Sequence, residues 1–295
     1  MKNKIDLLTL IGLFACLASY GQISGNQAYG NSDQHGNTPS REIILQGDSA
    51  MIISGYILLN TVADLYTVTL GLHQEAKTIK EGNDAMNKRI DSFKTSIASL
   101  GLTDKDMYVD FISQTKIYDY ALAGNKAEQF ERGFEIKKNT ILTLTNLSDV
   151  DRLLVKASEN GIYDLVKVDY VIKDVPRIYN QMMAAASDVI KHKKETYQKI
   201  ASFELLPGSK VFSERFYASY PNARYKSYSA FESSDIQEAS YKSSVIKKEE
   251  RKNTTFYYDG INPSGFDSII NPSSPIVGVQ YVMELKIRFD IKRTK

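Results

Sequence analysis

The sequence holds two Ser-x-x-Lys tetrapeptides, its nearest approach to a motif for nucleophilic catalysis. Ser113 is followed by Lys116, and Ser244 by Lys247, the spacing with which penicillin-binding enzymes and class A β-lactamases activate a serine hydroxyl. The partner motifs Ser-Asp-Asn and Lys-Thr-Gly are absent, and a chain this rich in serine and lysine contains such matches by chance. Ser113 also falls within a predicted strand, whereas those enzymes place the serine at the start of a helix. We therefore predict no catalytic residue.

Metal ligation has equally little support in the sequence. The histidines His35, His73 and His192 have no second histidine three or four residues away, the spacing of a helical zinc site. Three aspartates stand close together, at Asp104, Asp106 and Asp110. That segment lacks the glycine and the closing glutamate of an EF-hand calcium loop. Glycine-rich nucleotide-binding motifs are absent as well, so we predict no metal ligands, no cofactor-binding residues and no cofactor.

Two polar clusters leave the interpretation open. His192 stands in the charged run 191–195 on a predicted helix, which is either a solvated face or a patch for an anion or an acidic partner. A second cluster interleaves tyrosines with lysine and arginine, at Tyr217, Tyr220, Tyr225, Tyr228 and Tyr241. It is either a surface loop that packs its own rings or a surface for a glycan or a partner chain.

Length and composition indicate a globular protein. The 295 residues suffice for one large domain or two modest ones, and either would bury a sizeable core. With 42% hydrophobic and 24% charged residues, the chain lies far from the composition of disordered proteins. The formal net charge of +2 is too small to predict nucleic acid or an acidic membrane surface as a partner.

Residues 1–21 are predicted to be a signal peptide. Lys2 and Lys4 precede an apolar run over residues 7–18, which has the length of a signal-peptide core and is too short to span a bilayer. Small residues at its end predict cleavage after Gly21. The alternative is lipidation of Cys16, because the residues before it loosely resemble a lipobox. Both readings predict export, and cleavage leaves a mature chain with no cysteine for a disulfide or a thiolate site.

The mature chain is expected to begin with a flexible segment. Residues 22–40 are rich in Gly, Asn, Ser and Gln, with hardly any apolar residues, and are predicted to be a tether. The folded domain is expected to occupy residues 41–295, with a Ser/Tyr-rich insert at about 209–275. No transmembrane segment is predicted in the mature chain.

The domain is predicted to contain two strand–helix–strand units. The first has strands at 65–72 and 107–120 around a helix at 79–100, whose apolar residues recur every three or four positions. The polar residues 121–132 are predicted to form a connection to the second unit.

The second unit is the most readable stretch of the chain. A strand at 134–144 leads to a helix in which Ser148 and Asp151 have the spacing of a capping box, and a strand follows at 166–172. Asn160-Gly161 is expected to end this helix in the left-handed conformation.

Further elements flank the two units. A buried strand is predicted at 51–59, with Gly55 as a bulge or a close approach, and a helix at 174–202. The segment 209–275 is expected to be irregular. Strict alternation of apolar and polar residues over 277–291 predicts a long strand that enters the sheet. The fold class is therefore α+β, a mainly antiparallel sheet with helices packed on one face, built from the two repeats and the C-terminal strand.

The order of these elements resembles the SIMPL domain family of exported bacterial proteins. The segments that carry the resemblance lie at residues 62–72, 101–106, 133–144, 157–161 and 168–174. The resemblance covers roughly residues 42–205 and 275–291. Ala63 replaces the proline that is usual in the family, and the segment 209–275 is longer than expected, so the family says nothing about that segment.

The resemblance implies a protein of the cell envelope, periplasmic or associated with the outer membrane. Members of the family are associated with self-assembly into large ring-like or barrel-like oligomers and with resistance to oxidative stress, and no catalytic residues are established for them. The leading hypothesis is a non-enzymatic homo-oligomer. Its physical basis is the long C-terminal strand and the tyrosine-rich insert, which are surfaces suited to subunit contacts. The alternative is a periplasmic binding module for a cell-wall or lipid ligand, with residues 209–275 as its mouth.

Overall fold

The computed structural model describes residues 27–29, 44–46, 49–123, 126–201, 203–230, 253–272 and 277–292. The chain divides into two compact units, one formed by residues 1–34 and 225–259 and the other by residues 35–224 and 260–295. The predicted signal peptide lies outside the described residues. Of the predicted tether, only a short strand is described.

The smaller unit contains a three-stranded antiparallel sheet in the order β1-β9-β10. Its strands are β1 (Gln27–Tyr29), β9 (Tyr225–Ala230) and β10 (Asn253–Tyr258). The rings of Tyr225 and Tyr258 meet edge to face, with their centroids 6.1 Å apart. The Lys226 amine lies 2.5 Å from the Asp259 carboxylate. Ring and charge contacts thus support the end of the β9–β10 pair.

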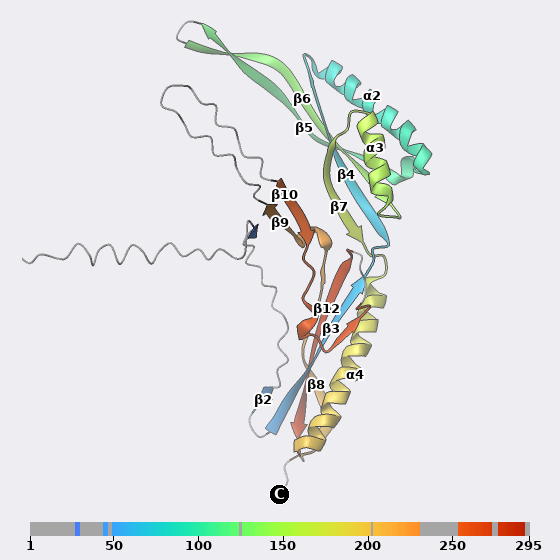
Figure 1. Cartoon of the computed structure of the whole chain (residues 1–295), viewed down its shortest axis with the longest axis vertical. Coiled ribbons are helices and arrows are strands. Elements are labelled where there is room, and N and C mark those ends of the chain that lie inside the picture. The colour runs from blue at the N-terminus through green and yellow to red at the C-terminus, as the bar shows by residue number, and fades with distance from the viewer. Residues whose placement is uncertain are drawn as a thin grey trace, which may run out of the picture. The chain divides into compact units, whose positions relative to one another are not determined.

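The larger unit contains two sheets (Figure 1). The first has the order β11-β3-β12-β8, with β2 also paired to β3. Its strands are β2 (Ile44–Gln46), β3 (Ala50–Thr61), β8 (Leu205–Ser219), β11 (Ser268–Ile270) and β12 (Val279–Ile291). All its pairings are antiparallel except that of β11 with β3. The predicted C-terminal strand is confirmed, and it lies inside the sheet between β3 and β8.

Helix α4 (Val175–Ala201) covers the first sheet. Its buried residues are Ile178, Met182, Ala186 and Ile190, spaced four apart on one face. Gly55 of β3 faces this helix, and a Cβ there would lie only 2.9 Å from the Ala186 carbonyl oxygen. The predicted close approach at Gly55 is therefore confirmed. Ile200, in the last turn of α4, is 76% exposed, so the buried stripe does not reach the end of the helix.

The second sheet has the order β5-β6-β4-β7 and is antiparallel throughout. Its strands are β4 (Leu65–Ala76), β5 (Met107–Ala123), β6 (Lys126–Leu144) and β7 (Asp164–Val171). Helix α2 (Ile79–Ile97) connects β4 to β5, and α3 (Asp149–Glu159) connects β6 to β7. This βαββαβ order is the split βαβ arrangement of ferredoxin-like domains. The two predicted strand–helix–strand units are confirmed, and they form one sheet together.

The helices α2 and α3 pack on one face of the second sheet, and their ends are fixed differently from the prediction. Thr78 and Glu81 form a capping box at the start of α2. The capping box predicted at Ser148 is wrong, because Ser148 has helical backbone angles (φ −62°, ψ −20°) and its side chain makes no capping hydrogen bond. An extended backbone at the N-cap is what lets the side chain reach the first turn. Gly161, with φ +71°, ends α3 as predicted.

The predicted connection at 121–132 is wrong. Strands β5 and β6 continue through it and pair from Met107 with Leu142 to Ala123 with Lys126. The two residues between the strands are Gly124 and Asn125, a pair typical of two-residue hairpin turns. Cross-strand hydrogen bonding therefore overrides the polar, helix-permissive composition of this segment.

The irregular structure expected for 209–275 is also wrong for the described part of that segment. Strand β8 pairs along β12, β9 pairs with β10, and β11 pairs with β3. Serine between the aromatic residues weakens the alternation of apolar and polar positions by which such strands are recognised. The α+β fold class is confirmed, with the strands divided among sheets rather than gathered in one.

Packing at Gly55 gives a prediction about stability. In Gly55→Val, the new side chain would collide with the α4 backbone and with Ile190 Cγ1, 3.2 Å from the Cβ position. We expect the free energy of unfolding to fall by about 2–3 kcal/mol, measured by urea denaturation. The control is Gly71→Ala in β4, where the nearest heavy atom would be 3.3 Å away and the expected change is below about 1 kcal/mol. Equal losses in the two variants would contradict this account.

Candidate functional site

The Ser-x-x-Lys match at Ser113 does not assemble a nucleophile. Both residues lie on β5, where Ser113 pairs with Lys137 and Lys116 pairs with Phe134. Positions three apart in a strand point to opposite faces of the sheet. The Lys116 amine instead binds the Glu131 carboxylate at 2.7 Å, and this hydrogen bond raises the pKa of Lys116. A lysine held in its charged form cannot serve as the base that such a mechanism needs. Ser244 and Lys247 lie outside the described residues.

The residues considered as metal ligands lie apart. His73 is on β4 and His192 is on α4, while His35 lies outside the described residues. The Asp106 carboxylate accepts hydrogen bonds from the backbone and hydroxyl of Thr103, which lower its pKa. Within the described ranges, no group of three His, Cys, Asp or Glu residues could hold a metal ion. None of the helices in those ranges is long and apolar enough to cross a lipid bilayer.

The charged run on α4 has a structural role that neither sequence interpretation included. Lys193 extends from the helix to the Asp267 carboxylate at 2.7 Å and to the Ser54 carbonyl oxygen at 2.8 Å. The same Asp267 oxygen accepts a hydrogen bond from the Tyr56 backbone amide. Lys194 lies over the Phe289 ring, 4.8 Å from its centroid. Two of the cations in the run therefore bind helix α4 to the first sheet.

The predicted tyrosine cluster divides between the two units. Tyr217 and Tyr220 belong to the larger unit and Tyr225 and Tyr228 to the smaller one, while Tyr241 lies outside the described residues. The Arg215 guanidinium lies 4.9 Å from the Tyr217 ring, so this ring packs against its own strand.

Tyr281 is a buried tyrosine that the sequence did not identify as a candidate functional residue. It lies on β12, is 1% exposed, and stacks on the ring of Phe216 at 5.5 Å. Burial, together with the neighbouring Tyr220 hydroxyl, raises the pKa of Tyr281 to about 12. This phenol stays protonated at neutral pH and is not a ready nucleophile.

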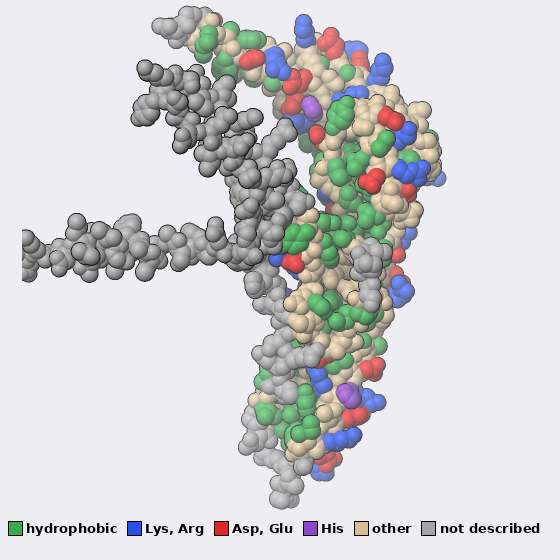
Figure 2. Space-filling view, in the orientation of Figure 1, with side chains coloured by type: hydrophobic (Ala, Val, Ile, Leu, Met, Phe, Trp, Pro, Cys, Tyr) green, Lys and Arg blue, Asp and Glu red, His purple; other side chains and the backbone are tan. Residues whose placement is uncertain are grey.

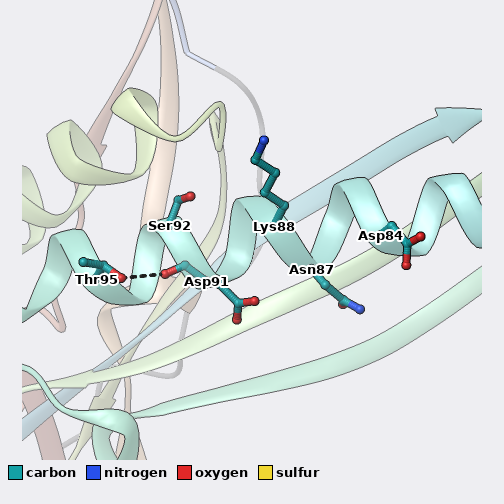
Figure 3. Close-up of a pocket in the computed structure, with 6 residues that line it drawn as sticks. All are labelled: Asp84, Asn87, Lys88, Asp91, Ser92 and Thr95. Carbon is teal, nitrogen blue, oxygen red and sulfur yellow. Dashed lines mark hydrogen bonds between the residues drawn. The ribbon is translucent and has the colours of Figure 1, made fainter.

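One surface hollow lies along the outer face of helix α2. Figure 3 shows its lining side chains, all from this helix, and they point in different directions rather than toward a common centre. They are Asp84, Asn87, Lys88, Asp91, Ser92 and Thr95. Within this set, Thr95 donates to the Asp91 carbonyl oxygen at 3.0 Å, an ordinary helix-internal bond. Side chains that do not converge cannot hold a small ligand.

A second depression, on the helix-free face of the second sheet, is better formed. Its floor is Gly71 of β4, and its volume is about 390 Å³, within the range of small-molecule sites. A Cβ at Gly71 would touch Val166 Cγ2 at 3.3 Å and Asp164 Cβ at 3.4 Å. Val166 and Asp164 therefore pack close to the Gly71 backbone, on the side where a side chain would lie.

Two irregularities in the outer strands flank this depression. The pairing of β5 with β6 shifts between Phe111 and Ser113, and the pairing of β4 with β7 shifts between Thr69 and Leu70. The residues left over are Ile112 and Val166, of which Ile112 lines the depression. Bulges turn side chains away from their regular directions and are frequent next to binding sites.

Polar side chains from three of the strands surround the floor. His73 comes from β4, Asp164 from β7, and Glu135, Lys137 and Asn139 from β6. The Lys137 amine binds the Glu135 carboxylate at 2.9 Å. The arrangement offers hydrogen-bond donors and acceptors without a nucleophile–base pair, so its chemistry is binding.

The outer part of the β5–β6 hairpin is a second candidate surface. Strand β4 pairs with β6 only from Phe134 to Leu144, so among the described strands residues 126–133 pair with β5 alone. Large apolar side chains are exposed along this part, at Tyr118, Tyr120, Leu122 and Phe130. Figure 2 shows hydrophobic side chains along this end of the hairpin, beside charged ones.

Comparison with known proteins places this geometry in context. Residues 52–252 match the family SIMPL, described as a protein of unknown function (DUF541). That match spans more than half of the chain, from β3 to the segment between β9 and β10. A comparison with curated proteins finds no match.

The Lys193–Asp267 ion pair gives a prediction about stability. In Lys193→Met, the nearly buried Asp267 carboxylate would lose its cation and keep the Tyr56 amide. Because breaking a buried ion pair strands a charge, we expect a loss of about 2–3 kcal/mol in the free energy of unfolding, measured by urea denaturation. Lys191→Met, an exposed position of the same run, is the control and should change it by less than about 0.5 kcal/mol. Losses of the same size in both would show that total charge on α4 is what matters.

Proposed function

The chain belongs to the SIMPL family of proteins of unknown function, and from this premise we propose that it is a non-enzymatic, exported component of the cell envelope that associates with further copies of itself. The observation that carries the proposal is the outer part of the β5–β6 hairpin, a two-stranded ribbon with exposed aromatic and aliphatic side chains.

A ribbon of this kind needs a partner. Two strands without a third strand or a covering helix are marginally stable in water, and in the part of the chain that the structure describes they extend alone past the end of β4 at Ala76. Leu122, near the tip, is 85% exposed, and leaving a leucine side chain in water is unfavourable. Contact with another protein surface would remove these apolar groups from water.

One face of the ribbon carries most of the apolar groups. Lys116 pairs with Phe134, and Phe134 pairs with Ala76 on the face of the second sheet that α2 covers. Because alternate residues of a strand share a face, Tyr118, Tyr120 and Leu122 continue that face beyond the helix. It is therefore an extension of the core-facing surface, and the described helices do not cover it.

The charges on the ribbon favour a second copy over a lipid surface. Its charged residues are Lys116, Asp119, Lys126, Glu128, Glu131 and Arg132. Three positive and three negative charges give no net attraction to anionic lipid. A mixed set of this kind can pair with itself across a two-fold axis, where each subunit presents the same patch.

The sheet edges offer further contacts, though not where the sequence indicated. The C-terminal strand β12 lies between β3 and β8, so it has no free edge and gives no support to self-association. The outer strand β8 supports it instead, since Val211 and Phe212 are exposed there. Edge strands with exposed apolar residues readily pair with another chain.

Export is proposed from the N-terminal sequence. A basic start, an apolar core and small residues before Gln22 support cleavage after Gly21, with delivery to the periplasm or the outer membrane. Lipidation at Cys16 is the competing route to the same compartment.

Self-association can be tested on residues 22–295 by size-exclusion chromatography with light scattering. We expect an assembled species, and in Tyr120→Ser with Leu122→Ser a dissociation constant raised by at least about tenfold, because the ribbon loses its apolar contact. Val155→Ser is the control, since Val155 is exposed on α3 away from the ribbon. Circular dichroism checks that each variant is folded. A monomer at about 100 μM, or equal assembly in all variants, would refute the proposal.

Processing can be tested by expressing the full chain in a Gram-negative host and measuring the intact mass of the envelope fraction. We expect a chain that begins at Gln22, unchanged by Cys16→Ser, because cleavage after Gly21 removes Cys16. A lipid-sized mass increase that Cys16→Ser abolishes would establish the lipidated form. An unprocessed chain in the cytoplasm would refute export.

A further inference from the structure

We propose that the depression over Gly71, on the helix-free face of the second sheet, binds one or two sugar units of an uncharged polysaccharide. This inference goes beyond self-association and does not rest on it. It also moves the ligand site away from residues 209–275, where the sequence placed the mouth of a binding module.

The size and position of the depression suit a small rigid ligand. Its volume of about 390 Å³ lies near the lower end of the range for small-molecule sites. All four strands of the sheet contribute, through Gly71, Ile112, Asn139 and Asp164. Groups on paired strands keep their spacing when no ligand is bound, so little order has to be gained on binding.

The apolar walls suit the C–H face of a sugar ring. Ile112, 49% exposed, lines the depression, and Val166, 55% exposed, would touch a Cβ at Gly71. Both are the extra residues of strand bulges. Since bulges redirect side chains, the two outer strands each place a branched aliphatic group beside a floor that has none.

The polar rim suits hydroxyl groups. The Asn139 amide offers both donors and an acceptor, the Asp164 carboxylate offers acceptors, and the His73 ring offers either. These groups come from neighbouring strands around the floor, so they can bind hydroxyls on different sides of one ring.

The charge of the rim excludes a strongly anionic ligand. The Lys137 amine is already paired with Glu135 at 2.9 Å, and Asp164 adds a further negative charge. A phosphate would meet this carboxylate, while the other lysine of the lining, Lys138, directs its amine to the Asn87 side-chain oxygen on α2. A neutral ligand with many hydroxyl groups avoids that repulsion.

The test uses cellobiose and N,N′-diacetylchitobiose as probes on the folded protein, with inorganic phosphate for comparison. Amide chemical shifts would locate binding, and titration would give the dissociation constant. We expect at least one disaccharide to bind with a millimolar dissociation constant and to shift the amides of β4 and β6 around Gly71 and Asn139. Phosphate should cause no shift there.

Two variants and a control sharpen the test. Asn139→Ala removes one hydrogen-bonding group and Gly71→Ala partly fills the floor, and each should weaken binding by about fivefold to tenfold. Thr95→Ala, on the outer face of α2, should not change it. The proposal would be overturned if neither disaccharide bound below about 20 mM, if both site variants bound as tightly as the original chain, or if phosphate bound instead. The proposed sugar site does not require self-association. A negative result in this binding test would therefore leave the self-association proposal unaffected.

Discussion

Strands β3 and β12 come from opposite ends of the described chain and pair in one antiparallel register, from Ala50 with Asp290 to Thr61 with Val279. This pairing brings together two strands that are far apart in the sequence. The other elements of the larger unit that lie between β3 and β12 in the sequence form a loop closed by this pair. Strand β3 is also buried on both faces, by α4 on one side and by a cluster around Phe266 on the other. A strand with no solvated face tolerates no slip, because a shift by one residue would exchange its two sets of side chains. Both ends of the sequence must therefore be present before the first sheet can form.

The sequence predicted the elements whose apolar residues recur with a clear period. Alternation along β12 indicated the face that packs in the main core, and the stripes of α2 and α4 indicated the faces that these helices bury there. Prediction failed where strands are held by cross-strand hydrogen bonds and their sequence shows no regular alternation of apolar and polar residues. Residues 121–132 are polar on average, yet they continue β5 and β6 because each strand supplies the hydrogen bonds of the other. Strand β8 was missed for a related reason, since at the edge of its sheet it mixes exposed apolar residues such as Phe212 with charged ones.

The candidate site could be predicted even less well than the fold. Gly71 is visible in the sequence as a glycine within a strand, which suggests a close approach or a bulge. No residue near Gly71 in the sequence indicates that Asn139 and Asp164 lie around it. These two residues follow Gly71 by 68 and 93 positions. That proximity depends on the strand order β6-β4-β7. It also depends on two bulges, each the consequence of one extra residue in an outer strand.

The two proposed activities use opposite faces of the same sheet. Tyr118, Tyr120 and Leu122 continue the face that α2 covers, whereas Gly71 and the depression lie on the helix-free face. A second copy seated on the helix-side face of the ribbon would leave the depression open. A copy seated on the other side of the ribbon, where Phe130 is exposed, would approach the depression and compete with a ligand. Coupling between assembly and ligand binding would therefore report which side of the ribbon is used, since only one of the two arrangements makes ligand and subunit exclude each other.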